Sequence, residues 1–170
     1  ANPDLRPEYS RGPQGGIELY YGNIGSFTIN RYVQSVTDLI QRVQVDSIYL
    51  QQVNSTFGYW RALDQYRNTA RIRQHGIEST GTLNFSAFTI RGTWSWTDSR
   101  VDYVDPLQFG TAMHKGQSFV MVPTHTGSIS LSYARGPASF SWITNVFGKS
   151  LRNTNDLIEM QMRSVWRLPM

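Results

Sequence analysis

The chain has 170 residues and no cysteine; 16% of its residues are charged and 13% are aromatic. The many aromatic side chains exclude a disordered chain, the missing cysteines exclude disulfides and zinc–cysteine sites, and no apolar run of about 18 residues exists to form a transmembrane helix. The net charge of +4 reflects 16 basic residues, nearly all arginine, but these are scattered along the chain and do not indicate a nucleic-acid-binding protein.

Apolar and polar residues alternate in seven segments of the chain, and a period of two predicts β-strands. In one segment, for example, Phe88, Ile90 and Trp94 share one face, while threonine, serine and arginine occupy the other. Helical periodicity is nearly absent. In chain order, the predicted strands are residues 15–22, 26–36, 70–85 and 87–99, the two arms of a hairpin within 126–144, and residues 156–168.

The connections between these strands alternate in length. The short ones are residues 22–25, 84–87 and 134–137, and the long ones are residues 37–69, 98–122 and 148–155. In an antiparallel meander, this alternation places every short turn at one end of the sheet and every long loop at the other. Outer-membrane barrels have this layout, with short periplasmic turns and longer extracellular loops.

The two faces of the predicted sheet differ in the way that a membrane barrel requires. The polar faces are rich in serine, threonine and asparagine, which suits a wet lumen. Aromatic residues flank all three short turns, as expected at a membrane–water interface; they are Tyr20, Tyr21, Phe27, Phe85, Phe88, Tyr133 and Phe140. The sequence therefore predicts an all-β protein, an antiparallel up-and-down meander that forms part of a transmembrane β-barrel with seven or eight strands.

Two other folds remain open from these patterns. In a soluble all-β binding or structural module, the apolar faces would pack on each other. In a small independent outer-membrane barrel, an eighth strand within residues 45–60 would complete the even number that single-chain bacterial barrels use.

The sequence contains no arrangement of residues typical of a catalytic or metal site. No G-x-S-x-G motif marks a nucleophilic serine, and the glycines of residues 12–16 lack the strand and helix that surround a phosphate-binding loop. His75, His114 and His125 do not have metal-ligand spacing, and the two prolines of residues 2–8, NPDLRPE, indicate an extended turn. We therefore expect a protein that is not an enzyme and that has no catalytic residues, metal or cofactor.

The long loops are the candidate ligand-binding regions. Aromatic rings and arginines concentrate in loop 37–69, and these side chains suit a flat, anionic or aromatic ligand. The alternative is that they pack within the loop or lie at the headgroup interface. Loop 98–122, with its aspartates and Tyr103, is a weaker candidate. The predicted ligand-binding residues are Tyr59, Trp60, Arg61, Tyr66 and Arg67, with Phe57 beside them.

The N-terminal run resembles a segment of TonB-dependent outer-membrane receptors. Residues 1–23 read ANPDLRPEYSRGPQGGIELYYGN, which is similar to the NPxLKPE segment and the glutamate-containing strand that lie late in those barrels. Two later runs, RNTARIRQHGIEST and GQSFVMVPTHTGSISLSY, resemble further strands of the family. Arg6 replaces the common lysine, Gln14 lies near a frequent glutamate, and the sequence ends at LPM without the family's terminal aromatic residue.

The resemblance implies that residues 1–170 are a C-terminal segment of such a barrel, without its plug domain and closing strand. Barrels of the family have about 22 strands. It also implies a receptor of the bacterial outer membrane that takes up a scarce substrate of the siderophore, cobalamin or carbohydrate class. The expected partners are outer-membrane lipid and lipopolysaccharide, the small-molecule substrate, and the TonB complex, which acts through a plug domain outside this chain. No nucleic acid is expected.

Overall fold

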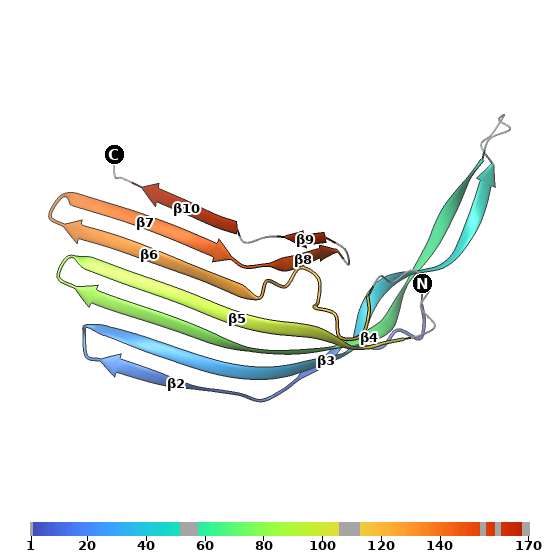
Figure 1. The fold of residues 1–170 in the computed structure, drawn as a ribbon, viewed down its shortest axis with the longest axis horizontal. Coiled ribbons are helices and arrows are strands. Elements are labelled where there is room, and N and C mark those ends of the chain that lie inside the picture. Colours follow the sequence, from blue (N-terminus) through green and yellow to red (C-terminus); the bar gives the residue numbers. More distant parts are fainter. Residues whose placement is uncertain (1, 52–57, 106–112, 154–155, 159–160, 168–170) are drawn as a thin grey trace. The chain divides into compact units, whose positions relative to one another are not determined.

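The structure is a computed structural model that describes residues 2–51, 58–105, 113–153, 156–158 and 161–167. These residues form strands and connections, and none of them is helical (Figure 1). No helix that could cross a membrane occurs in this part of the chain. The strands are β1 (Tyr9–Arg11), β2 (Gln14–Tyr21), β3 (Gly25–Gln51), β4 (Gly58–Phe85), β5 (Phe88–Val104), β6 (His125–Arg135), β7 (Ala138–Phe147), β8 (Ser150–Asn153), β9 (Asp156–Ile158) and β10 (Gln161–Arg167).

The main sheet is a meander. Strands β3, β4, β5, β6, β7 and β10 follow one another across it, and β1 and β2 both pair with β3. The registers of β1 and β2 with β3, of β5 with β6, and of β7 with β6 and β10 are antiparallel. A separate small sheet joins β8 and β9. The predicted all-β, antiparallel up-and-down fold is confirmed, and the sheet is open, as in a partial barrel.

Three tight turns join β2 to β3, β4 to β5, and β6 to β7, and Figure 1 shows them beside one another at one end of the sheet. Each contains a residue in the left-handed region: Gly22 at φ 52°, Ser86 at φ 53° and Gly136 at φ 59°. In the first turn, the amide of Ile24 donates a hydrogen bond to the carbonyl of Tyr21 (2.9 Å). The prediction that the short turns gather at one end is confirmed.

The predicted long loop 37–69 is wrong over most of its length. β3 continues to Gln51 and β4 starts at Gly58, so this region is a long strand pair whose tip, residues 52–57, lies outside the described residues. Residues 45–51 extend β3 and do not form an eighth strand. The segment was missed because cross-strand polar pairs, such as Arg42 with Asp64 (2.5 Å), replace the apolar–polar contrast of the other strands.

The remaining connections are also shorter than predicted. β5 continues to Val104, well into the predicted loop 98–122. The predicted connection 148–155 contains β8, and the predicted seventh strand, residues 156–168, corresponds to β9 and β10.

The chain divides into two compact units. The first unit comprises Ala1–Arg11, Ser35–Arg73 and Arg100–Gln117, and the second comprises Gly12–Gln34, Gln74–Ser99 and Ser118–Met170. All buried hydrophobic residues among those described belong to the first unit. They are Val43, Ala70, Ile72 and Val101.

Candidate functional site

One face of the second unit is a continuous apolar surface. Side chains at opposed positions of neighbouring strands lie on the same face, and here apolar residues oppose apolar residues. The pairs are Ile17 with Ile29, Leu19 with Phe27, Phe88 with Tyr133, Ile90 with Leu131, Leu131 with Trp142, and Tyr133 with Phe140. Ile17 is 62% exposed and Ile129 is 44% exposed. A soluble sandwich would bury such a face against a second sheet, and the other sheet among the described residues is only the two-stranded pair β8 and β9.

The opposite face of the same strands is polar. Thr89 opposes Ser132, and Thr93 opposes Ser128 with their hydroxyl oxygens 2.7 Å apart. On β2, the hydroxyl of Tyr20 donates a hydrogen bond to a carboxylate oxygen of Glu18 (2.7 Å). The alternation predicted for the hairpin within 126–144 is therefore present, and its serines line the polar face.

A hydrogen-bonded network crosses β3, β4 and β5 on this polar face. The hydroxyl oxygens of Tyr32 and Thr97 are 2.8 Å apart, and the side chain of Gln74 donates to that of Gln34 (2.7 Å). Tyr32 can cross β4 because Gly76 has no side chain; a Cβ there would overlap the Tyr32 ring and the carbonyl oxygen of Trp96. Beside the network lies a polar hollow of about 250 Å³, lined by Gly12, Pro13, Gln14, Tyr32, Gln34, Gln74 and Glu78.

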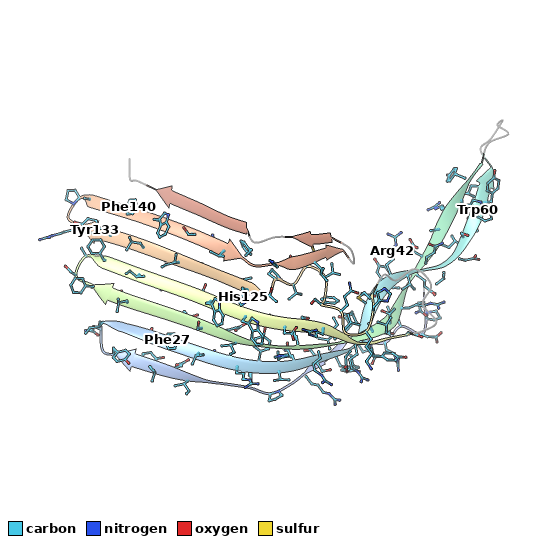
Figure 2. All side chains as sticks on the ribbon, viewed as in Figure 1. Phe27, Arg42, Trp60, His125, Tyr133 and Phe140 are labelled. Carbon is cyan, nitrogen blue, oxygen red and sulfur yellow. The ribbon has the colours of Figure 1, made fainter. Side chains whose placement is uncertain are left out.

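Aromatic residues mark both ends of the apolar face. Next to the tight turns, the ring centroids of Phe88 and Tyr133 are 4.8 Å apart, and Figure 2 shows Tyr133 and Phe140 near the turn that joins β6 to β7. Trp96 lies about halfway along β5, eight residues after Phe88. The eight steps from Phe88 to Trp96 span about 27 Å along a strand. A barrel tilt of about 35–45° reduces this to a height of about 20 Å, which fits within the apolar band of about 25 Å in outer-membrane barrels.

In the first unit, hydrogen bonds and an ion pair connect the segment NPDLRPE to β3 and β4. Arg6 forms an ion pair with Asp38 (2.8 Å), and a carboxylate oxygen of Glu8 accepts a hydrogen bond from the amide of Ile40 (2.6 Å). The side chain of Asn68 donates to the carbonyls of Arg6 (2.8 Å) and Asp38 (2.7 Å) and accepts from the amide of Arg6 (2.8 Å). Two of the three charged side chains of this segment, Arg6 and Glu8, thus bond to β3.

Two hollows lie next to the hydrogen bonds between Arg6 and Asn68. One, of about 580 Å³, is lined by Asn2, Pro3, Asp4, Arg6, Gln65, Arg67 and Asn68. The other, of about 390 Å³, is lined by Arg6, Thr37, Asp38, Asn68, Thr69, Ala70, Arg71, Tyr103 and Asp105. Both are polar. The first is lined by two arginines and one aspartate, so it suits an anionic group better than an apolar one, whereas two arginines and two aspartates balance in the second.

The predicted ligand-binding residues all lie on β4 rather than in a loop. Tyr59, Trp60, Arg61, Tyr66 and Arg67 are exposed, Trp60 to 70%. The rings of Trp60 and Tyr49 meet edge to face (5.4 Å), and Arg67 lines the 580 Å³ hollow, where its Nε donates to Gln65 (3.0 Å). Strand alternation places Trp60 and Tyr66 on one face and Tyr59, Arg61 and Arg67 on the other, so the five residues do not converge. Phe57 lies outside the described residues.

The residues noted in loop 98–122 separate as well. Asp102 pairs with Arg73 in the first unit (3.6 Å), whereas Asp98 lies 3.8 Å from His75 in the second unit. The amide of His114 donates to the Gln117 side chain (3.0 Å). Over the described ranges, no group of three or more His, Asp or Glu side chains could hold a metal ion.

Sequence reasoning missed two features of these sites. Asn68 had no local signal, because its partners lie 30 and 62 residues away along the chain. Gly76 did have one, since an isolated glycine within a strand pattern often marks a close approach of another group.

The family model described as TonB dependent receptor-like, beta-barrel matches residues 1–159. Among solved structures, the FrpB iron transporter from Neisseria meningitidis (F3-3 variant) is similar with a TM-score of 0.62 and 16% identity, over 94% of this chain and 24% of that one. The siderophore receptor PirA from Acinetobacter baumannii is similar with a TM-score of 0.62 and 15% identity, over 95% of this chain and 25% of that one.

The chain thus spans about a quarter of these two proteins. No curated protein matches it. The apolar face, the polar face and the one-sided tight turns are those of a barrel wall, and the resemblance carried by NPDLRPE is confirmed over nearly the whole sequence. The chain belongs to the TonB-dependent receptor-like β-barrel family, a family of outer-membrane transport receptors.

Proposed function

We propose that this chain forms part of the barrel wall and the extracellular rim of an outer-membrane receptor that takes up a scarce substrate with energy from the TonB complex. The observation that carries the proposal is the apolar face of the second unit. It combines exposed Ile17, Ile90 and Ile129 with a polar opposite face, and lipid is the environment that stabilises such a surface without a protein partner.

Strand length supports an extracellular position for the first unit. β3 and β4 have 27 and 28 residues, whereas about 9–11 residues of a tilted strand cross a bilayer. The tight turns belong to the second unit and are short, as periplasmic turns are. The far parts of β3 and β4, Ser35–Gln51 and Gly58–Arg73, therefore extend outside the hydrocarbon on the extracellular side.

The substrate class to test first is the iron chelates. The two structural neighbours are named an iron transporter and a siderophore receptor, and the 580 Å³ hollow of the first unit suits an anionic ligand. Cobalamin and carbohydrates are the alternatives. The TonB complex would act through a plug domain elsewhere in the receptor, with residues 1–170 as barrel segment.

The orientation of the chain in the outer membrane can be tested in living cells by labelling single introduced cysteines. The chain contains no cysteine of its own that would react. We expect the Trp60→Cys variant of the receptor to react with a bulky, membrane-impermeant maleimide on intact cells. The Ser86→Cys variant should react only after the outer membrane is permeabilised. Labelling of Ser86→Cys on intact cells, or recovery of the receptor in the soluble fraction, would contradict the proposal.

Ligand contact by Tyr59, Trp60, Arg61, Tyr66 and Arg67 is tested by binding of ferric siderophores to whole cells. Loss of an aromatic anchor typically costs more than 1 kcal/mol, so Trp60→Ala should weaken binding by about tenfold. Phe85→Ala is the matched control, because Phe85 is equally exposed (74%) but lies at the tight-turn end. Equal binding by both variants would remove Trp60 from the ligand site.

A further inference from the structure

Two imidazoles and two indoles form a cluster on the second unit, at the end of the apolar face opposite the tight turns. His75 and Trp96 meet edge to face with ring centroids 5.5 Å apart, and Trp94 and His125 stack at 6.0 Å with 28° between their planes. Trp96 and His125 occupy opposed positions of β5 and β6. Figure 2 shows His125 at the start of β6, at the far end of this strand from Tyr133.

The polar atoms of this cluster are mostly unused within the described part of the chain. The indole N–H groups of Trp94 and Trp96 and the imidazole of His125 make no hydrogen bond to any residue that the structure describes. His75 lies beside Asp98, whose carboxylate oxygen is 3.8 Å from its Nε2. The cluster therefore presents several N–H donors, next to one carboxylate that can accept.

The position of the cluster determines what can meet these donors. Ile90 and Leu131 lie on the same face nearer the tight turns. Asp98 comes two residues after Trp96 on β5 and therefore falls on this face too, on the side of the cluster away from the turns. The apolar face thus ends at this line, and a lipid at the same depth would place its headgroup, not its acyl chains, against the cluster. Indole and imidazole rings prefer this depth, because each has an apolar body and a polar edge.

The chemistry of the cluster fits a phosphorylated sugar. N–H donors bind phosphate oxygens, the stacked rings of Trp94 and His125 offer a flat surface to the C–H face of a pyranose, and Asp98 can accept from a sugar hydroxyl. A phospholipid headgroup supplies the phosphate but no pyranose ring.

We propose that His75, Trp94, Trp96, Asp98 and His125 bind the phosphorylated glucosamine headgroup of lipopolysaccharide in the outer leaflet. This inference rests on the proposed membrane orientation and adds a defined lipid site to it. The donors and the flat stacked surface contact the headgroup, while the acyl chains continue along the apolar face toward Ile90 and Ile129.

The test uses the whole receptor purified from outer membranes, delipidated, and titrated with purified lipopolysaccharide or with phosphatidylglycerol, with bound lipid counted by native mass spectrometry. The combined variant Trp94→Phe, Trp96→Phe and His125→Phe keeps the rings but removes their donors. We expect it to bind lipopolysaccharide at least about tenfold more weakly, because hydrogen bonds to charged groups are among the strong ones. His125→Phe alone should show a smaller loss in the same direction.

Tyr133→Phe is the matched control, since it removes one hydroxyl from the aromatic residues at the other end of the face, and it should leave lipopolysaccharide binding unchanged. Unchanged lipopolysaccharide binding in the triple variant, or an equal loss for phosphatidylglycerol, would overturn the inference. Its failure is distinguishable from failure of the proposed function: a wild-type receptor found outside the outer membrane overturns both, whereas a receptor correctly located there, with variants that bind lipopolysaccharide normally, overturns this site alone.

Discussion

The two units of this chain are both β-structure, but different interactions stabilise them. The first unit has a small buried core, with Val101 only 1% exposed, and a polar fastening around Asn68. The second unit buries no hydrophobic side chain among its described residues and exposes a whole apolar face. Strand pairing satisfies the backbone in both. Under the proposed function, this difference corresponds to water as the solvent of the first unit and lipid as the solvent of one face of the second.

The same substitution in the two units gives the largest expected contrast. Ile72→Ala removes a buried side chain and leaves a cavity, so it should destabilise the first unit by about 2–5 kcal/mol. Ile90→Ala lies on the apolar face of the second unit, where lipid chains refill the space, and its effect should be clearly smaller. Hydrogen exchange of the two units in the receptor reconstituted in vesicles measures both; equal effects would contradict the contrast.

An arginine on the apolar face of a strand in the second unit should destabilise the protein, whereas an arginine on the polar face of the same strand should not. Ile129→Arg puts a guanidinium in the middle of the apolar face and should cost about 2–4 kcal/mol, as arginine does near the bilayer midplane. Ser130→Arg adds the same charge on the polar face and should cost little. Guanidinium unfolding of the receptor in vesicles, followed by tryptophan fluorescence, compares them. If Ser130→Arg were the more damaging variant, the assignment of the two faces would be reversed.

The second unit is the part that the sequence predicts well, because its two faces differ sharply in polarity. Each strand there carries an apolar–polar contrast, as with Ile129 and Leu131 against Ser128 and Ser130, and two of the three tight turns place a glycine, Gly22 or Gly136, in the left-handed region. In the first unit the contrast fades. Charged residues such as Arg42 and Asp64, which form an ion pair between β3 and β4, interrupt the apolar face there, so the period-two hydrophobic signal is weak and the pattern predicts a loop instead of long strands.

The candidate sites were less predictable than the fold for a related reason. The aromatic residues and arginines of β4 were recognisable by type, but the faces they occupy depend on a strand that had been interpreted as a loop. The contacts of NPDLRPE with β3 and β4 depend on Asn68, whose side chain can make its hydrogen bonds only after folding has brought Arg6 and Asp38 next to it. The cluster of His75, Trp96 and His125 likewise requires the register of three strands, which the sequence order alone does not determine.

Replacing Asn68 tests how much its side-chain hydrogen bonds contribute to the stability of the first unit. Asn68→Ala deletes three hydrogen bonds to Arg6 and Asp38, at about 0.5–1.5 kcal/mol each, so a loss of about 2 kcal/mol is expected. The increase in hydrogen exchange should concentrate in residues 2–11. Asn84→Ala is the control, because the exposed Asn84 side chain lies in the second unit, where it donates to the carbonyl of Asn23 (3.5 Å) and accepts from the hydroxyl of Thr89 (3.0 Å), so its loss should leave exchange in residues 2–11 unchanged. An Asn68→Ala variant with unchanged exchange in residues 2–11 would show that other contacts hold the segment.

The Arg6–Asp38 ion pair should contribute least, although it is the most conspicuous contact of the same fastening. The Arg6 side chain is 69% exposed and that of Asp38 is 29% exposed, and ion pairs of this kind contribute about 0.2–1 kcal/mol because water and salt screen them. We expect Arg6→Ala to shift the unfolding midpoint slightly in low salt, and the shift to vanish in 1 M NaCl as the Debye length falls to about 3 Å. The backbone of Arg6 still bonds to Asn68 in this variant. A loss as large as that of Asn68→Ala, undiminished by salt, would mean that the charge pair rather than the asparagine holds the N-terminal segment to β3 and β4.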